Sequence, residues 1–188
     1  MTPVSDSPIL ETERLALRRF TDTDADAALL LELDSDPEVM RYVGPFGLTS
    51  VVAYRERVRT WLPYCEHPGR GVWALDEKAT GAFLGWVMLR DATAHRFAAE
   101  IGWTQSTDLE LGYRLRRTAW GRGYATESAT ELVRRALADP EVTAVVAVAL
   151  VTNRGSTRVL EKAGLTFERE VPLPGFADPG AVYAARRA

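Results

Sequence analysis

The sequence predicts a single α/β domain, and three observations lead to this prediction. The chain has 188 residues, a length at which one hydrophobic core commonly suffices. Strand-like and helix-like segments alternate along it, with no internal repeat and no low-complexity linker. The segment Val142–Val151 is almost wholly apolar and rich in valine, which is typical of a strand buried on both faces and paired in parallel. We therefore expect residues 1–188 to form one domain, with residues 1–9 flexible.

The first half of the chain predicts a strand, two helices and a hairpin of strands. Leu15 and Leu17 fall on one face of the first strand, and Arg18 falls on the other. Thr21–Asp24 is rich in N-cap residues and precedes strong helix formers, whereas Pro63 is expected to disrupt the end of the second helix. The expected elements are a strand at Arg14–Phe20, helices at Ala25–Leu33 and Ser50–Cys65, and strands at Gly71–Asp76 and Ala82–Arg90.

In the second half, strands alternate with helices. Apolar residues between Ala125 and Leu137 recur at helical spacing. Asn153 is expected to cap a short helix that ends at Gly164, a residue suited to a C-terminal cap. The expected elements are a short strand at Phe97–Trp103, a strand at Leu109–Arg116, a helix at Ala125–Ala138, a strand at Val142–Val151, the helix that Asn153 caps, and strands at Leu165–Val171 and Ala181–Ala185.

Composition excludes several classes of protein. The net charge of −3 and the pI near 5.5 argue against a general nucleic-acid binder. The single cysteine, Cys65, allows no internal disulfide, and Met1–Leu10 lacks the pattern of a signal peptide. The longest strictly apolar run, Ala144–Val151, is eight residues and too short to span a membrane. His67 and His95 lack a pattern of metal-ligating partners. We expect a cytoplasmic protein that binds no metal, nucleic acid or membrane.

A glycine-rich turn at Trp120–Ala125 lies between an expected strand and an expected helix. Gly121 and Gly123 allow close approach of the backbone to a ligand, and the first N–H groups of the helix favour an anion. Arg122 adds positive charge. The turn therefore predicts a phosphate cradle, with a simple tight turn as the alternative. The Walker pattern is absent, and Thr126 stands where the dinucleotide fingerprint requires a third small residue.

At these residues the sequence resembles the GNAT N-acetyltransferases, and more narrowly their ribosomal-protein-alanine N-acetyltransferase branch. Glu110–Glu127 resembles the acetyl-CoA-binding motif of that family. Thr12–Arg18 is similar to the opening strand of the branch, and Asn153–Ser156 followed by Val159–Leu165 is similar to a later helix. The resemblance covers roughly residues 10 to 187, with these segments in the family's order.

The resemblance implies a mixed, mostly antiparallel sheet, flanked by helices, in which two parallel strands splay apart. Here these strands would be Leu109–Arg116 and Val142–Val151, with the pantetheine arm of acetyl-CoA between them. The arm would pair with backbone groups near Leu115 and Arg117, and the pyrophosphate would lie on the amides from Arg122 to Thr126. The implied cofactor-binding residues are Leu115, Arg116, Arg117, Gly121, Arg122, Gly123, Tyr124, Ala125, Thr126 and Asn153.

Acetyl transfer to an amine requires a neutral nucleophile, and therefore a base. At pH 7 deprotonation requires about 1 kcal/mol for an α-amine and nearly 5 kcal/mol for lysine. A carboxylate acting through water can easily deprotonate the α-amine. Glu110, on the expected splayed strand Leu109–Arg116, is the first candidate for this base. Its alternative role is that of a strand residue paired with an opposite charge. Glu100 is a rival because Glu100–Trp103 imitates Glu110–Tyr113 in sequence.

The leaving thiolate requires a hydrogen-bond donor. Many GNAT enzymes carry a tyrosine as general acid four residues before the glycine that ends the later helix, and here Leu160 stands in that place. Ser156 is therefore the next candidate, and helix capping is the alternative role for Ser156 and for Asn153. Arg154, Arg158 and Lys162 are candidates for the 3′-phosphate of the cofactor, or form a solvated helix face.

The resulting hypothesis is an acetyl-CoA-dependent N-acetyltransferase in which a primary amine attacks the thioester directly. The acceptor is open between a protein N-terminus and a small cationic amine, and a homodimer is plausible by resemblance. The alternatives are a non-catalytic acyl-CoA-binding or sensing module and a dinucleotide binder. Thr21–Glu38 holds seven acids and no Lys or Arg, and Arg114–Arg122 holds four arginines and no acid. We expect the arginines to face the cofactor and the acids to attract a cationic acceptor.

Overall fold

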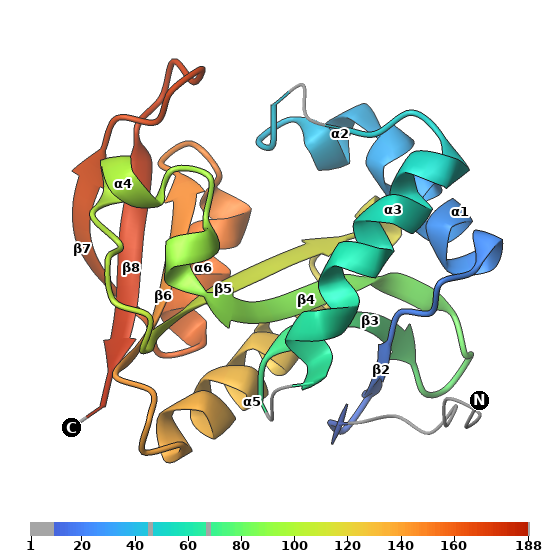
Figure 1. The fold of residues 1–188 in the computed structure, drawn as a ribbon, viewed down its shortest axis with the longest axis horizontal. Helices are drawn as coiled ribbons and strands as arrows, with labels where there is room; N and C mark the ends of the chain where they lie inside the picture. The colour runs from blue at the N-terminus through green and yellow to red at the C-terminus, as the bar shows by residue number, and fades with distance from the viewer. Residues whose placement is uncertain (1–9, 45–46, 67–68, 188) are drawn as a thin grey trace.

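The computed structural model describes residues 10–44, 47–66 and 69–187, and an eight-stranded sheet forms its centre (Figure 1). The strands are β1 (Leu10–Glu11), β2 (Leu15–Arg19), β3 (Gly71–Glu77), β4 (Phe83–Asp91), β5 (Asp108–Leu115), β6 (Ala144–Leu150), β7 (Thr166–Val171) and β8 (Gly180–Arg186). The α-helices are α1 (Asp24–Ser35), α2 (Pro37–Met40), α3 (Val51–Trp61), α4 (Ala98–Ile101), α5 (Tyr124–Ala138) and α6 (Arg154–Lys162). Short 3₁₀ turns lie at Leu62–Glu66, Ala92–Ala94 and Arg117–Ala119. Residues 1–9, expected to be flexible, lie outside the described residues.

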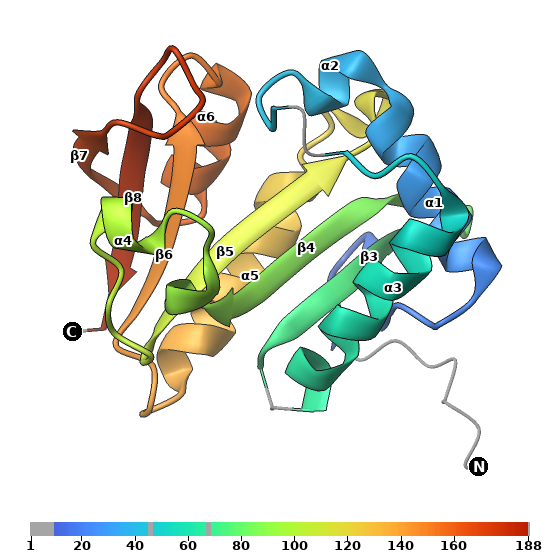
Figure 2. The same cartoon turned by 45° about the horizontal axis from the view of Figure 1, so that its top comes forward.

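The sheet is antiparallel except at one place in its middle. Its strand order is β1-β2-β3-β4-β5-β6-β8-β7, and only β5 and β6 run parallel. Their ladder joins Asp108–Glu110 to Ala144–Val146 and then stops, although both strands continue. Figure 2 shows the two strands diverging beyond this ladder. The expected mixed sheet with one splayed parallel pair is therefore confirmed.

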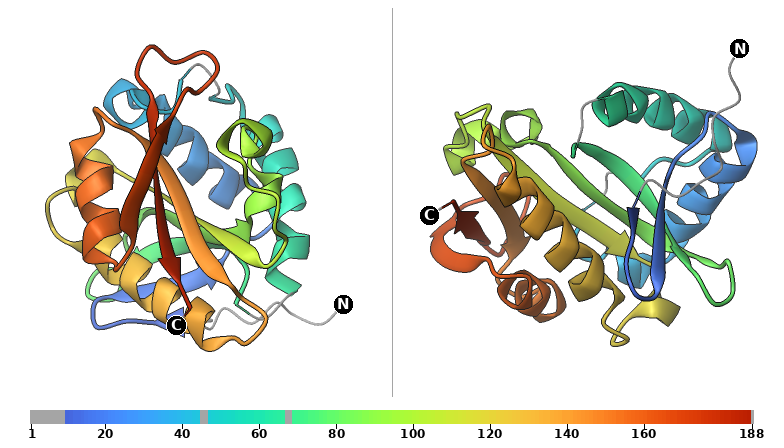
Figure 3. Two further views of the ribbon diagram at one scale, coloured as in Figure 1. Left: turned by 90° about the vertical axis from the view of Figure 1, so that its left-hand side faces the viewer. Right: turned by 90° about the horizontal axis from the view of Figure 1, so that it is seen from below.

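Helices cover both faces of the sheet. α1 and α3 lie on one face, and α5 and α6 lie on the other (Figure 3). The inward residues of β5, Leu109, Leu111 and Leu115, pack in one hydrophobic cluster with Leu132 and Val133 of α5. Full burial of each such side chain contributes roughly 2 kcal/mol. This cluster holds β5 and α5 together and so positions the turn that connects them.

The expected helix starts are confirmed by their capping hydrogen bonds. Thr23 accepts the N–H of Asp26 at the start of α1, and Ser50 accepts an N–H in the first turn of α3. Asn153 accepts the N–H of Ser156 at 3.1 Å, as its place before α6 predicts. Each cap satisfies a backbone donor that has no partner inside its helix.

One expected strand is wrong. Phe97–Trp103 contains the four-residue helix α4 rather than a strand. Gly102 ends this helix with a φ of 81°, a conformation that glycine adopts without steric strain. Phe97 and Ile101 are four residues apart, so one helical turn directs both side chains into the same buried cluster, which also holds Trp103. The sequence of so short a segment favours a strand only weakly, and the burial of these side chains favours the helical turn instead.

Gly85 keeps β4 beside β5 where β5 leaves β6. Its φ is 144°, and a Cβ atom there would lie 2.1 Å from the carbonyl oxygen of Arg114. Only glycine therefore allows the two backbones to approach this closely. The N–H of Arg116 then donates to the carbonyl of Leu84 at 2.8 Å, which extends the pairing past the end of β5. β5 thus stays attached to β4 as it diverges from β6.

Candidate active site

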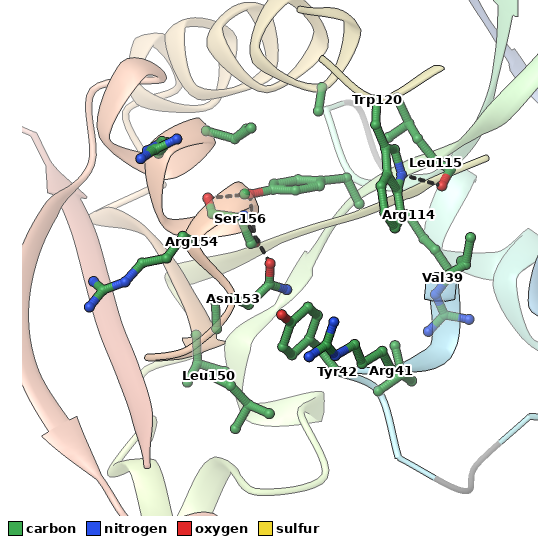
Figure 4. A pocket seen from close by; sticks show the side chains of 18 of the residues that line it. Val39, Arg41, Tyr42, Arg114, Leu115, Trp120, Leu150, Asn153, Arg154 and Ser156 are labelled. Atoms are coloured by element: carbon green, nitrogen blue, oxygen red, sulfur yellow. Dashed lines mark hydrogen bonds between the residues drawn. The ribbon is translucent and has the colours of Figure 1, made fainter. Parts of the chain in front are cut away.

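A cavity of about 880 Å³ lies where β5 and β6 diverge. One wall comes from the ends of β5 and β6 and from the first turns of α5 and α6. The facing wall comes from the segment after α2, from residues 95–97 and from the loop between β7 and β8. Figure 4 shows Asn153 and Ser156 on the first side, with Arg41 and Tyr42 across from them. The cavity follows from the short parallel ladder, because fully paired strands would leave no such space.

The N-terminus of α5 lines this cavity without a side-chain cap. Gly123, the N-cap residue, has a φ of 84° and offers no side chain that could accept the first amide N–H groups. Helices α1, α3 and α6 by contrast each have a side-chain cap. The first turn of α5 therefore presents amide donors and the positive end of the helix dipole. The predicted residues that meet at this end of the cavity are Gly121, Gly123, Tyr124, Ala125 and Thr126.

The three predicted cofactor-binding arginines lie outside the cavity lining. Arg116 pairs with Glu32 at 2.7 Å, and Arg117 pairs with Asp36 at 3.3 Å. Arg122 pairs with Glu77 at 3.1 Å and stacks over the ring of Tyr124. The cations that line the cavity beside α5 come instead from α6; they are Arg154, Arg158 and Lys162.

Each of the seven acids in the run Thr21–Glu38 has an arginine partner. The pairs are Asp22 with Arg55 and Arg59, Asp24 with Arg55, Asp26 with Arg18, Glu32 with Arg116, Asp34 with Arg114, Asp36 with Arg117, and Glu38 with Arg41. Three of these pairs join the acidic run to the arginine run Arg114–Arg122. These acids were expected to attract a cationic acceptor, and the structure pairs each of them with an arginine of the chain.

Leu115, one of the expected contacts of the cofactor arm, is the last residue of β5 and lines the cavity. Its carbonyl oxygen accepts the indole N–H of Trp120 at 2.8 Å. This hydrogen bond holds Trp120 against the cavity, although its side chain stays 46% exposed. A ligand in the wedge would therefore meet both the strand edge and the indole ring (Figure 4).

Tyr113 joins the two sides of the wedge. Its hydroxyl oxygen lies 2.9 Å from Oγ of Ser156 and 2.9 Å from the carbonyl oxygen of Ser156. Burial raises the pKa of Tyr113 above its usual range, so the phenol is neutral. Leu160 is buried in the core and supplies no hydroxyl. Sequence reasoning used Tyr113 only as a spacing marker, because its contact with α6 joins residues 43 positions apart.

Glu110 lies at the last residue of the parallel ladder, behind the cavity wall. Its carboxylate is buried and accepts Nε–H of Arg90 at 2.8 Å. Burial raises the pKa of Glu110, and Arg90 and Arg96 oppose that rise. Its other oxygen lies 3.7 Å from Nε2 of His95, which lines the cavity. The rival Glu100 is exposed on α4 and does not line the cavity.

His95 is the site residue that sequence reasoning placed outside the chemistry. Burial, together with the guanidinium groups of Arg90 and Arg96, lowers its pKa to about 4, so the ring is neutral at pH 7. Nδ1 accepts the N–H of Phe97 at 3.1 Å, which leaves the ring proton on Nε2, facing Glu110. No local pattern reveals this pair, because its two members come from different segments.

Two other expectations bear on the site. Within residues 10–44, 47–66 and 69–187, no group of three His, Cys, Asp or Glu side chains could hold a metal ion. Over the same ranges, no helix is long and apolar enough to cross a membrane.

Comparison with known proteins gives consistent results. Residues 14–166 match the family described as the acetyltransferase (GNAT) domain. FsC-acetyl coenzyme A-N(2)-transacetylase of Aspergillus fumigatus is 32% identical over 195 residues, which span 96% of this chain and 77% of the relative. An acetyltransferase structure from Agrobacterium tumefaciens superposes with a TM-score of 0.71 at 26% identity, covering 98% of this chain and 97% of its own. RimL, a ribosomal L7/L12 α-N-protein acetyltransferase solved with coenzyme A, superposes with a TM-score of 0.73 at 16% identity, covering 95% and 97%.

Proposed function

The chain belongs to the GNAT acetyltransferase family, and we propose that it transfers the acetyl group of acetyl-CoA to a primary amine held in the cavity between β5 and β6. The observation that carries this proposal is the end of the parallel ladder at Glu110. It leaves the strand edges beyond it open to a ligand, and the uncapped N-terminus of α5 lines the same cavity. Unpaired strand groups suit an amide-bearing pantetheine arm, and an uncapped helix end suits a pyrophosphate.

The chain's own groups fit acetyl-CoA in distinct parts of the cavity. The amides of residues 123–126 would hold the pyrophosphate. Arg154, Arg158 and Lys162 line the cavity on α6 and would contact the 3′-phosphate. The strand edge at Leu115 and the side chain of Asn153 would hold the pantetheine amides. Three further arginines would contact the phosphates after leaving their present carboxylate partners. These are Arg116, paired with Glu32, Arg117, paired with Asp36, and Arg122, paired with Glu77.

Acetyl-CoA supplies an activated acyl group when bound, and the protein would accept one proton from the amine and stabilise the leaving thiolate. Glu110 would take the proton of the attacking amine through water as the C–N bond forms. Ser156 would donate a hydrogen bond to the sulfur as the C–S bond breaks. Tyr113 would hold the Ser156 hydroxyl in place through their hydrogen bond. No acyl-enzyme is required, since the amine reacts directly.

The test has two parts. Calorimetry measures acetyl-CoA binding, and a panel of amines, including short peptides and aminoglycosides, is then assayed for release of CoA thiol. We expect Glu110→Gln to bind acetyl-CoA normally and to lose about 100-fold in kcat, the effect of removing a general base. The matched control Glu100→Gln should retain wild-type turnover.

Other outcomes separate the alternatives. Binding of acetyl-CoA without turnover of any amine would favour a non-catalytic acyl-CoA-binding module. Wild-type turnover by Glu110→Gln at every pH would remove Glu110 from the role of base. Equal losses in both variants would show that acidic charge in general, rather than the buried carboxylate, is required.

A further inference from the structure

Arginines and aromatic rings line the end of the cavity that faces away from α5 and α6. This acceptor end comes from α2 and the segment after it, from the turn between β4 and α4, from β5 and from the loop between β7 and β8. Its charged and ring-bearing residues are Glu38, Arg41, Tyr42, His95, Arg96, Phe97, Arg114 and Phe176. His95 is neutral, so the charged groups of this lining are three arginines and one carboxylate, and two of the arginines are ion-paired, Arg41 with Glu38 and Arg114 with Asp34.

The carboxylates behind the acceptor end are already neutralised. Asp34 accepts Nη1–H of Arg114 at 2.6 Å and the hydroxyl of Tyr54 at 2.7 Å. Glu110 accepts from Arg90 at 2.8 Å. The one lining carboxylate, Glu38, is 51% exposed and lies 3.7 Å from Arg41. Over the described part of the chain, the acceptor end therefore offers an ammonium group no buried carboxylate that lacks a cationic partner.

Arg96 lines this end beside two aromatic rings. Its guanidinium stacks over Phe97 and Phe176, at 4.7 and 5.8 Å from the ring centroids, and donates to the carbonyl of Val43 at 3.2 Å. Burial lowers the pKa of Arg96, and the nearby Arg114 and Arg90 lower it further. An anion that enters here would meet the Arg96 guanidinium, with those of Arg41 and Arg114 held nearby in ion pairs with Glu38 and Asp34. The two rings beside Arg96 would at the same time contact an apolar group of the ligand.

The Arg96 guanidinium would also act on the amine. Nearby cations disfavour an ammonium ion and so lower the pKa of a bound amine. The acceptor end would thus select the neutral amine, which is the nucleophilic form. A polycation has no such advantage, because each further ammonium group would meet the same repulsion.

We propose that the acceptor is a small primary amine that also carries a carboxylate and an apolar group, as an aromatic amino acid does. Arg96 and Arg41 would bind the carboxylate, and Phe97 and Phe176 would contact the apolar group. This inference rests on the proposed function, whose cavity and reaction it uses. It replaces the cationic acceptor that the acidic run suggested.

Three amines that share one ring test the proposal. Phenylalanine carries the carboxylate, phenylalaninamide replaces it with a neutral amide, and phenylethylamine lacks both. We expect kcat/KM, expressed per unprotonated amine, to be about tenfold or more higher for phenylalanine than for the other two, because only its carboxylate can accept charge-assisted hydrogen bonds from the arginines. Kanamycin, spermidine and a hexapeptide complete the panel. A higher kcat/KM for any of these, or for phenylalaninamide, would overturn the proposal.

A substitution tests the assigned residue. Arg96→Gln should bring the ratio of kcat/KM for phenylalanine over phenylalaninamide close to one. Arg57→Gln, which removes an exposed arginine of α3 outside the cavity lining, should leave both the ratio and the activity unchanged. An unchanged ratio in Arg96→Gln would contradict the assignment.

The result remains decisive where turnover is absent. Failure to bind acetyl-CoA would overturn the proposed function itself. If acetyl-CoA binds and no amine of the panel reacts, binding of N-acetylphenylalanine and of its amide is compared by calorimetry. Tighter binding of the carboxylate supports the inference, and equal or weaker binding overturns it.

Discussion

The hydroxyl of Tyr113 has a single hydrogen and two oxygen neighbours, Oγ and the carbonyl oxygen of Ser156, each 2.9 Å away. If the phenol donates to Oγ, the hydrogen of Ser156 is available to a leaving sulfur. If it donates to the carbonyl, Ser156 donates back to the phenol. In both cases Tyr113 fixes the rotamer of Ser156. Leu160 stands where many members of the family have a tyrosine on helix α6. Here the tyrosine that contacts Ser156 comes from β5 instead.

This arrangement predicts coupled substitutions. Tyr113→Phe and Ser156→Ala should each lower kcat by about tenfold, and the double variant should lose little more, because the two groups act as one unit. Calorimetry should show acetyl-CoA binding close to wild type in all three. Multiplication of the two single effects in the double variant would show that the hydroxyls act independently.

His95 gives a prediction for stability against pH. Its pKa is about 4 in the folded protein, below the value of about 6.5 expected when unfolded. As pH falls from 6.5 to 4, the unfolded chain therefore takes up a proton that the folded chain excludes, and stability is lost. The shift corresponds to roughly 3 kcal/mol at most. His95→Gln should remove this loss.

Urea unfolding of both proteins at several pH values between 7.5 and 4.5 measures the effect. The wild-type free energy of unfolding should fall more steeply below pH 6.5 than that of the variant. Parallel curves would mean that His95 is protonated equally in both states.

At the residue scale, the sequence indicated site residues that belong to contiguous motifs. It did not indicate contacts between residues that only the fold brings together. The glycines of the turn and Asn153 were predicted, and they line the cavity. The contacts of Tyr113 with Ser156 and of His95 with Glu110 were not predicted. These contacts depend on how α6 and the 92–97 segment pack against β5, and no local spacing encodes that packing.

Among the elements, the turn that leads into α5 is the one proposed to hold the pyrophosphate of acetyl-CoA. Gly123 has a φ of 84°, which alanine adopts only with strain of about 1–2 kcal/mol, and an added Cβ would lie 3.3 Å from Nη2 of Arg14. Gly123→Ala should therefore distort the first turn of α5 and weaken acetyl-CoA binding by about tenfold. Calorimetric titration with acetyl-CoA measures this.

Gly81 supplies the matched control. Its φ is 70° in the turn between β3 and β4, and an added Cβ would meet no atom within 4 Å. Gly81→Ala should lower stability by a similar amount and leave acetyl-CoA binding unchanged. Equal weakening of binding in both variants would attribute the effect to general destabilisation and contradict the cradle.

The helices and strands were largely predictable because their signals are local. N-cap residues and a proline set the limits of α1 and α3, and alternation of apolar residues marked β2. α4 was not predictable, since four residues provide too little periodicity and their burial decides their structure. The splay of β5 and β6 came from the family resemblance rather than from any residue pattern.

Over the whole molecule, the two charge runs of the sequence bind each other. Three ion pairs join α1 and the start of α2 to β5 and the turn after it. The innermost pair, Asp34 with Arg114, is 9% and 18% exposed, whereas the outer pair of Glu38 with Arg41 is 51% and 62% exposed. Both runs are evident in the sequence, but their pairing is not, because residues 80 positions apart meet only in the fold.

Burial predicts different effects for these two pairs. Asp34→Asn leaves a largely buried guanidinium without its partner and should lower the free energy of unfolding by about 3 kcal/mol. Glu38→Gln removes an exposed partner and should change it by about 0.5 kcal/mol or less. Urea unfolding at low and high salt measures both, and equal effects would show that burial does not distinguish the pairs.

The central claim is that one cavity binds acetyl-CoA and an amine together and passes the acetyl group directly between them. The most direct measurement follows free CoA thiol and N-acetylated amine in one reaction, from the first turnover. We expect the two products to appear in equal amounts, with no thiol burst and no thiol release without the amine. A burst of thiol before any acetylated amine, or thiol released without acetylated amine, would contradict it.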